Sequence, residues 1–176
     1  MNIFKRLYLQ LARGGVLPVE ELRRRGMIIG DNCHIYTSKI DYPHAHLITL
    51  GDNVGISNAR LLAHDASTKP VLGYSKVGRI DIGNNVFVGV DALILPNVKI
   101  GNNVIIGAGT VVSKNIPDNV VVVGNPARII CSYDEYMEKN KKLFEKSPIF
   151  RNEFKTEEEK KTMRETLDNN VIGFDV

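Results

Sequence analysis

Apolar residues recur along this chain at a spacing of six. Six consecutive positions with that spacing are all Ile or Val, namely Ile82, Val88, Ile94, Ile100, Ile106 and Val112. A period of six fits neither the 3.6-residue repeat of a helix nor the two-residue repeat of a plain strand. It is typical of a parallel β-helix, in which one inward apolar residue marks each side of a triangular coil. The pattern therefore predicts an all-β fold for the central part of the chain.

A second run with the same spacing lies earlier in the chain, at Leu50, Ile56 and Leu62. The distance from Leu62 to Ile82 is 20 residues, which is three hexapeptides plus two, so part of this segment has to leave the coil. Residues 64–79 are the candidate loop, because Pro, Gly and Ser are frequent there and favour turns. We expect this loop to interrupt the later coils.

The two ends of the chain predict short helical appendages. Residues 1–28 begin with a helical stripe of apolar residues, and Pro18 can open a second short helix. Residues 131–176 are highly charged and are predicted to be helical, with a few apolar residues that could dock on the coils. The β-helix domain is accordingly expected to span residues 29–130.

The pairs Asn84-Asn85 and Asn102-Asn103 suit the corners of such coils, because Asn tolerates a left-handed backbone. The flat outer faces carry few large apolar side chains and do not form a deep pocket. A small-molecule site is more easily built where two prisms meet, with the loop at 64–79 as a wall.

Composition narrows the function classes. The 176 residues carry a net charge of +3, which is too small to indicate a nucleic-acid partner. No signal peptide or spanning segment is evident, so we expect a cytoplasmic protein without membrane association. Cys33 and Cys131 match no metal or redox spacing and are expected to be thiols in a reducing compartment.

Several segments resemble the hexapeptide-repeat acyltransferases, the group that includes galactoside, maltose and serine acetyltransferases. They are Leu-Ala-His-Asp at 62–65, Ile-Gly-Asn-Asn-Val-Phe-Val-Gly at 82–89, Gly-Ala-Gly-Thr-Val-Val-Ser-Lys at 107–114 and Gly-Asn-Pro-Ala-Arg at 124–128. The resemblance implies a left-handed coil and a homotrimer that binds acetyl-coenzyme A (acetyl-CoA) between adjacent subunits. It implies no metal.

In this family the residue at the position of His64 is the general base, and a neutral imidazole suits that task near pH 7. Asp65 is a candidate to orient the imidazole, although neighbouring strand residues point to opposite sides. His46 lies one coil length, or three hexapeptides, earlier and is a second candidate. His44 and Asp41 are weaker candidates for the same neighbourhood.

The resemblance also implies the residues that bind the coenzyme. Their exposed main-chain groups or basic side chains would hold the pantetheine arm and the phosphates, and they are Val90, Ala108, Ser113, Lys114 and Arg128. Val90 and Ala108 are three hexapeptides apart and are expected to stack one coil above the other. This chain has Cys131 where the family often has a basic residue, and Phe87 where many relatives have Trp.

The segments at 48–54 and 61–65 resemble members that O-acetylate sugars of capsular polysaccharide, exopolysaccharide or lipopolysaccharide units. The favoured function is therefore acetyl transfer from acetyl-CoA to a sugar hydroxyl. Transfer to the amine of an aminosugar is the nearest alternative, and a non-catalytic β-helix scaffold is a further one. A zinc hydratase on the same fold needs three His ligands. None of the four His residues lies in the later coils, so the sequence does not favour this alternative.

Overall fold

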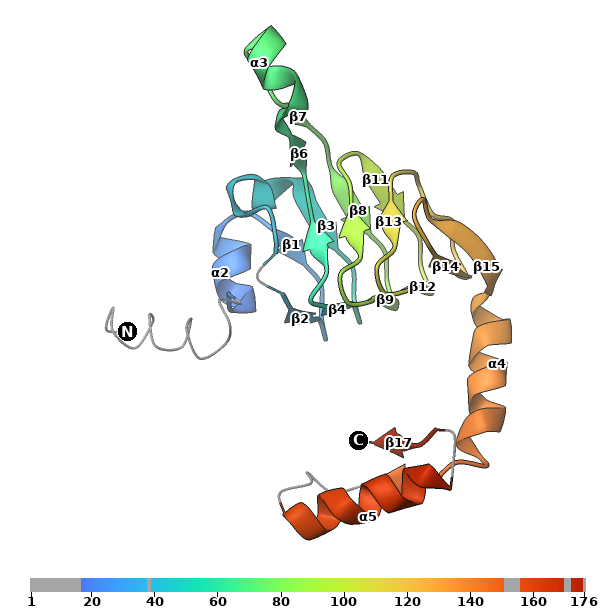
Figure 1. The fold of residues 1–176 in the computed structure, drawn as a ribbon. Coiled ribbons are helices and arrows are strands. Elements are labelled where there is room, and N and C mark those ends of the chain that lie inside the picture. The colour runs from blue at the N-terminus through green and yellow to red at the C-terminus, as the bar shows by residue number, and fades with distance from the viewer. Residues whose placement is uncertain (1–16, 38, 151–155, 170–171, 176) are drawn as a thin grey trace. The chain divides into compact units, whose positions relative to one another are not determined.

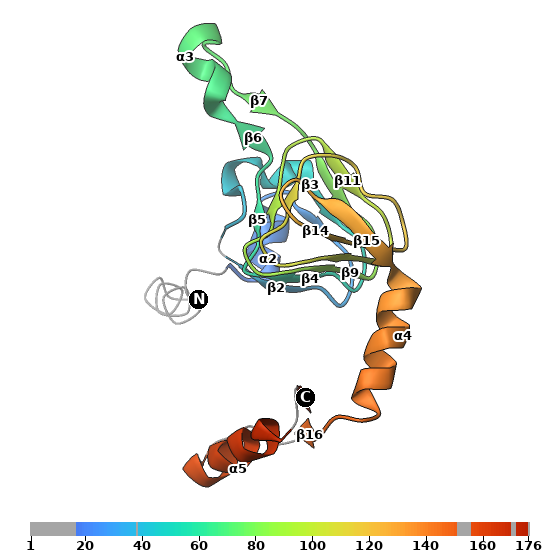
Figure 2. The same ribbon diagram turned by 45° about the vertical axis from the view of Figure 1, so that its right-hand side comes forward.

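The computed structural model describes residues 17–37, 39–150, 156–169 and 172–175, so the apolar stripe expected before residue 17 lies outside the described residues. Three sheets make up the central region (Figures 1 and 2). The first contains β1 (Ile28–Ile29), β3 (Ile48–Leu50), β8 (Ile80–Ile82) and β11 (Val98–Ile100), and the second contains β5 (Arg60–Leu61), β10 (Leu93–Ile94) and β13 (Val111–Val112). The third contains β2 (His34–Tyr36), β4 (Gly55–Ser57), β9 (Val86–Val88), β12 (Val104–Ile106), β14 (Val120–Val123) and β15 (Arg128–Ser132).

The chain visits the three sheets in turn, and the strands of these sheets pair in parallel up to β14. Val86 in β9 pairs with Val104 in β12, an offset of three hexapeptides. The six Ile and Val positions that set the period are all buried, with at most 3% of each residue exposed. Apolar side chains thus face inward from three sides, as in a parallel β-helix.

The inward position in the earlier run differs from the predicted one by one residue. Leu61 is fully buried and pairs with Ile94, whereas Leu62 is partly exposed. The corner before β5 contains Asn58 in the left-handed region, with φ 48°. Leu61 lies only five positions after Ile56, so this corner is one residue shorter than the hexapeptide count assumes.

Asparagine forms a ladder along one corner of the coils. Asn85 and Asn103 have positive φ, at 55° and 53°, which confirms the expected corner role of the second Asn in each pair. Each side-chain amide donates to the carbonyl oxygen of the next Asn, at 2.8–3.0 Å, and the ladder consists of Asn32, Asn53, Asn85, Asn103 and Asn119. These bonds tie each coil to the next one.

The segment expected as a loop is an ordered arm that extends beyond the coils (Figures 1 and 2). Its base is an antiparallel ribbon of β6 (His64–Asp65) and β7 (Lys76–Val77). Its outer part holds the 3₁₀ turn η2 (Ala66–Thr68) and the helix α3 (Lys69–Leu72). The arm thus begins with His64 itself.

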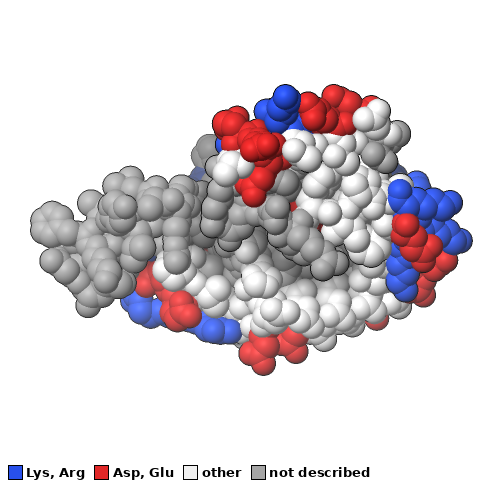
Figure 3. Space-filling model, turned by 90° about the horizontal axis from the view of Figure 1, so that it is seen from below, with Lys and Arg blue, Asp and Glu red and all other residues white. Residues whose placement is uncertain are grey.

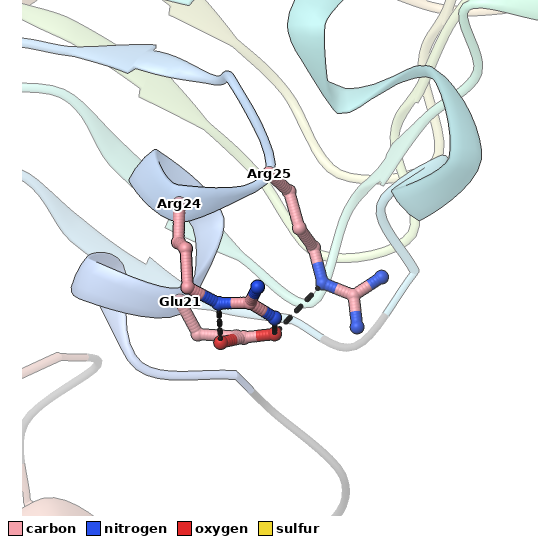
Figure 4. Close-up of polar contacts among 3 residues, drawn as sticks. All are labelled: Glu21, Arg24 and Arg25. Carbon is pink, nitrogen blue, oxygen red and sulfur yellow. Dashed lines mark hydrogen bonds and ion pairs between the residues drawn. The ribbon is translucent and has the colours of Figure 1, made fainter.

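Helix α2 (Val19–Arg24) begins after Pro18, as predicted, and packs Leu22 into the core at the first coil. The Glu21 carboxylate on its surface accepts hydrogen bonds from Arg24 at 2.8 Å and from Arg25 at 3.1 Å (Figure 4). At the other end, β14 and β15 pair antiparallel, which ends the run of parallel coils.

Residues Asp134–Val176 form a separate compact unit. Helix α4 (Tyr133–Phe144) leads into it, and α5 (Glu157–Asp168) begins with a capping box between Thr156 and Glu159. The two helices are not continuous, because β16 (Ile149–Phe150) lies between them and pairs with β17 (Phe174–Asp175). Among the described residues of this extension, these two segments are the helical ones.

Candidate functional site

The candidate base, His64, lies where the chain leaves the coil after β5 and enters the arm. The backbone holds this junction, since the Gly78 N–H donates to the Ala63 carbonyl at 2.9 Å and His64 pairs with Val77 across the ribbon. One third of the His64 side chain is exposed. The backbone of His64 is therefore held in place, while its imidazole remains accessible.

A buried carboxylate holds the ring of His64. Asp41 lies just before the 3₁₀ helix η1 (Tyr42–Leu47), and only 2% of its side chain is exposed. Its Oδ2 atom accepts hydrogen bonds from the Ala63 N–H at 3.1 Å and from His64 Nδ1 at 2.5 Å. Its Oδ1 atom lies 3.1 Å from His44 Nδ1. One carboxylate thus contacts two imidazoles.

The charge of Asp41 determines which nitrogen of each ring carries a proton. Burial alone would raise the pKa of this carboxyl, but the hydrogen bonds from His64 and His44 outweigh burial and lower the pKa below its usual value. An ionised carboxylate only accepts hydrogen bonds, so the Nδ1 atom facing it must donate. In the neutral ring of His64, Nε2 then has a free lone pair, which is what a general base requires.

The residues that we expected to orient His64 lie elsewhere. Asp65 accepts a hydrogen bond from the Ser67 N–H at 2.8 Å and pairs with Lys76 at 2.6 Å, and these contacts lower its pKa. His46 is exposed, and its ring centre is 6.3 Å from that of His44. Asp41, a weaker candidate from the sequence, occupies the orienting position. Counting one regular coil back from His64 misses it, because it lies 23 residues earlier.

Val90 and Ala108 occupy equivalent turns in successive coils. The residue after each has positive φ, with 56° at Asp91 and 67° at Gly109, and the Gly109 N–H donates to the Val90 carbonyl at 2.8 Å. Each is the second residue of a four-residue turn closed by a hydrogen bond from the fourth residue. The N–H of that second residue is not used by the turn, and within the described residues neither N–H has an acceptor.

The three other expected coenzyme contacts lie around one cavity. Its volume is about 480 Å³, and Ser113, Lys114 and Arg128 all line it. Its apolar lining includes Ile116 and Val122 of the last coil. Two exposed cations beside an apolar surface can bind the phosphates of an anionic ligand.

The base and the two free N–H groups lie at opposite edges of the sheet β5-β10-β13, where one edge is the row of strand starts and the other is the row of strand ends. Val90 and Ala108 precede β10 and β13, whereas His64 follows β5, and all three strands run in parallel. Asp91 is level with Asn58, to which its N–H donates. His64 lies six positions after Asn58, which corresponds to about 20 Å of extended chain.

The cluster at His64 also has the groups to hold a divalent metal. Asp41, His44 and His64 each offer a ligand atom, and these atoms lie within 4.8 Å of one another.

Across the described residues no helix is long and apolar enough to span a membrane. In the view of Figure 3, groups of Lys and Arg are drawn next to Asp and Glu, so basic and acidic side chains are mixed among the described residues seen there.

Comparisons with known proteins give the family. The model described as bacterial transferase hexapeptide (six repeats) matches residues 79–114. Protein CapG of Staphylococcus aureus is 40% identical over 141 residues, which is 75% of this chain and 80% of CapG. A maltose O-acetyltransferase from Clostridium difficile is 28% identical with a TM-score of 0.51, over 71% of this chain and 82% of that one. The chain belongs to the hexapeptide-repeat acetyltransferases.

A second solved member of the hexapeptide-repeat acetyltransferases contains the coenzyme. It is the acetyltransferase VCA0836 of Vibrio cholerae in complex with acetyl-CoA, which is 26% identical with a TM-score of 0.53. The match covers 61% of each chain. The recognised family and its acetyltransferase activity agree with the expectation from residues 62–65, 82–89, 107–114 and 124–128.

Proposed function

We propose that this acetyltransferase moves the acetyl group of acetyl-CoA to a hydroxyl of a sugar, with His64 as general base. The observation that carries the proposal is the contact between buried Asp41 and His64 Nδ1, which leaves Nε2 free to accept a proton. The maltose O-acetyltransferase supports a sugar acceptor, and the acetyl-CoA complex of VCA0836 supports the donor.

In the proposed reaction His64 Nε2 removes the proton of the acceptor hydroxyl as its oxygen attacks the thioester carbonyl. Asp41 stabilises the imidazolium that forms. His64 then returns the proton to the departing sulfur, so the products are the acetyl ester and free coenzyme A. The N–H groups of Val90 and Ala108 would bind the pantetheine amides, and Lys114 and Arg128 would bind the phosphates.

We further propose that the coil is left-handed and that the enzyme is a homotrimer. The separation of His64 from the Val90 and Ala108 turns along the sheet supports a site shared between two copies. In such a site His64 of one copy would face the Val90 and Ala108 turns of the next. In a closed ring of three copies each pair of neighbours would form one such site.

Release of coenzyme A thiol, measured with acetyl-CoA and a panel of sugars, nucleotide sugars and aminosugars, tests the proposal. We expect release that depends on a hydroxyl acceptor and falls at least a hundredfold in His64→Ala, as is usual when a general base is lost. Turnover only with amines would favour the aminosugar N-acetyltransferase instead. Failure to bind acetyl-CoA would leave the scaffold alternative.

A further inference from the structure

His44 is the one member of the Asp41 cluster that the proposed reaction does not use. Its Nδ1 atom lies 3.1 Å from Asp41 Oδ1, and its ring centre is 4.7 Å from that of His64. The side chain is 29% exposed, close to the 33% of His64. Two imidazoles therefore stand side by side at the surface, and both rest on one buried carboxylate.

The shared carboxylate gives the two rings the same tautomer. Asp41 can only accept, so both Nδ1 atoms donate to it, and both neutral rings have a bare Nε2. The two nitrogens of an imidazole point in widely different directions. Because both Nδ1 atoms face Asp41, both Nε2 atoms face away from that carboxylate.

The Nε2 atom of His64 suffices to take a proton from the reacting hydroxyl. The Nε2 atom of His44 is therefore an additional group beside the base that can accept a hydrogen bond. Its natural partner is a second hydroxyl next to the reacting one, since adjacent hydroxyls of a sugar ring lie close enough to meet neighbouring imidazoles. Holding Asp41 in place does not require this nitrogen, because His44 contacts the carboxylate through Nδ1.

We propose that His44 Nε2 binds the hydroxyl adjacent to the one that His64 deprotonates, and that the acceptor is a sugar with two neighbouring free hydroxyls. This inference rests on the proposed O-acetyl transfer and specifies its substrate class. It makes His44 a specificity-determining residue, because an acceptor without the second hydroxyl would leave its Nε2 without a partner.

The test compares matched acceptors. The best sugar of the panel, with its acetylated position located by NMR, is assayed beside the monodeoxy analogues that lack one hydroxyl next to that position. We expect kcat/KM of the wild type to fall at least tenfold on one of these analogues. In His44→Ala the intact sugar and that analogue should react within about twofold of each other. His46→Ala is the matched control, from the same 3₁₀ helix but without a hydrogen bond to Asp41 among the described contacts, and should keep the wild-type ratio.

The ratio of kcat/KM between the intact sugar and the deoxy analogue distinguishes a His44 that binds the second hydroxyl from a His44 that only positions Asp41. If His44 only held Asp41 in place, His44→Ala would slow both acceptors by the same factor, and that result would overturn the proposal. A wild type that acetylates hydroxyls without regard to the neighbouring hydroxyl would also overturn it, with the proposed function intact. A wild type that acetylates no hydroxyl would overturn both.

A measurement without acceptor checks the tautomer. The chain has only four His residues, so ¹⁵N spectra of the wild type and the four single His→Ala variants assign every ring. We expect His44 and His64 to show a protonated Nδ1 and a bare Nε2 above neutral pH. A protonated Nε2 on His44 would contradict the proposal even if the activity data agreed with it.

Discussion

The two edges of the sheet β5-β10-β13 are built in different ways. At the edge beside the arm, the candidate chemistry comes from the side chains of Asp41, His44 and His64. At the other edge it comes from main-chain N–H groups of Val90 and Ala108, which repeat with the coil. The regular edge can bind an extended molecule along successive coils, whereas the irregular edge can hold a single reactive group.

The largest effect short of removing the base is expected at the irregular edge, from Asp41→Asn. The amide keeps the size of the carboxylate but can donate to His64 Nδ1, which favours the tautomer with Nε2 protonated. We expect kcat to fall by a factor on the order of 10² to 10⁴, as for loss of an orienting carboxylate elsewhere. Steady-state kinetics of Asp41→Asn and the control Asp65→Asn measure this. Equal losses in the two variants would contradict the assignment, since Asp65 pairs with Lys76 in the arm.

The next largest effect is expected at the cavity of the last coil. Arg128→Ala should raise the KM for acetyl-CoA about tenfold with little change in kcat, because a charge-assisted contact to phosphate is lost. Lys99 is exposed and does not line this cavity, so Lys99→Ala serves as a control for lost positive charge. A similar rise in both variants would indicate a general charge effect instead of a phosphate site.

At the regular edge, Ala108→Pro removes the main-chain N–H that would contact the coenzyme. Ala108 precedes Gly109, whose φ is 67°, in a turn where Pro is favoured at the Ala108 position. We expect the KM for acetyl-CoA to rise about fivefold, the value of one hydrogen bond, while Ala108→Ser, which keeps the N–H, stays near wild type. An unchanged KM in the Pro variant would exclude the main-chain contact.

The smallest effect concerns stability in acid. Because the folded protein lowers the pKa of Asp41, its ionised form stabilises the fold above the unfolded pKa of about 3.9, and this contribution is lost as the pH falls through the lower folded value. The difference in unfolding free energy between wild type and Asp41→Asn should therefore shrink as the pH falls below about 4. Urea titrations of both proteins at several pH values measure this difference in unfolding free energy. A difference that stays constant with pH would show that the charge of Asp41 does not contribute to the stability of the fold.

The same contrast explains what the sequence could predict. The regular coils repeat every three hexapeptides, so the inward Ile and Val residues and the stacking of Val90 on Ala108 follow from counting. Counting fails where the chain departs from the hexapeptide. The short corner at Asn58 moves the inward residue from Leu62 to Leu61.

Asp41, the partner of His64, is only a weaker candidate from the sequence for a related reason. The 3₁₀ helix η1 adds residues to its coil, so that Asp41, 23 positions before His64, meets the ring instead of His46, one regular coil before it. A signal for it was present, since a carboxylate followed by two His residues precedes the coil that ends in His64. Its use depends on three-dimensional contacts that periodicity does not encode.

Mixed oligomers test most directly whether the two edges meet between copies. His64→Ala removes the base, and Ala108→Trp fills the path along the regular edge, so each variant alone should be inactive. When equal amounts are co-expressed in one ring, a site is intact only where an Ala108→Trp copy supplies His64 to a neighbouring His64→Ala copy, which is about one quarter of all sites. The account predicts recovery of about a quarter of wild-type activity. No recovery, in oligomers shown to contain both variants, would contradict a site shared between subunits.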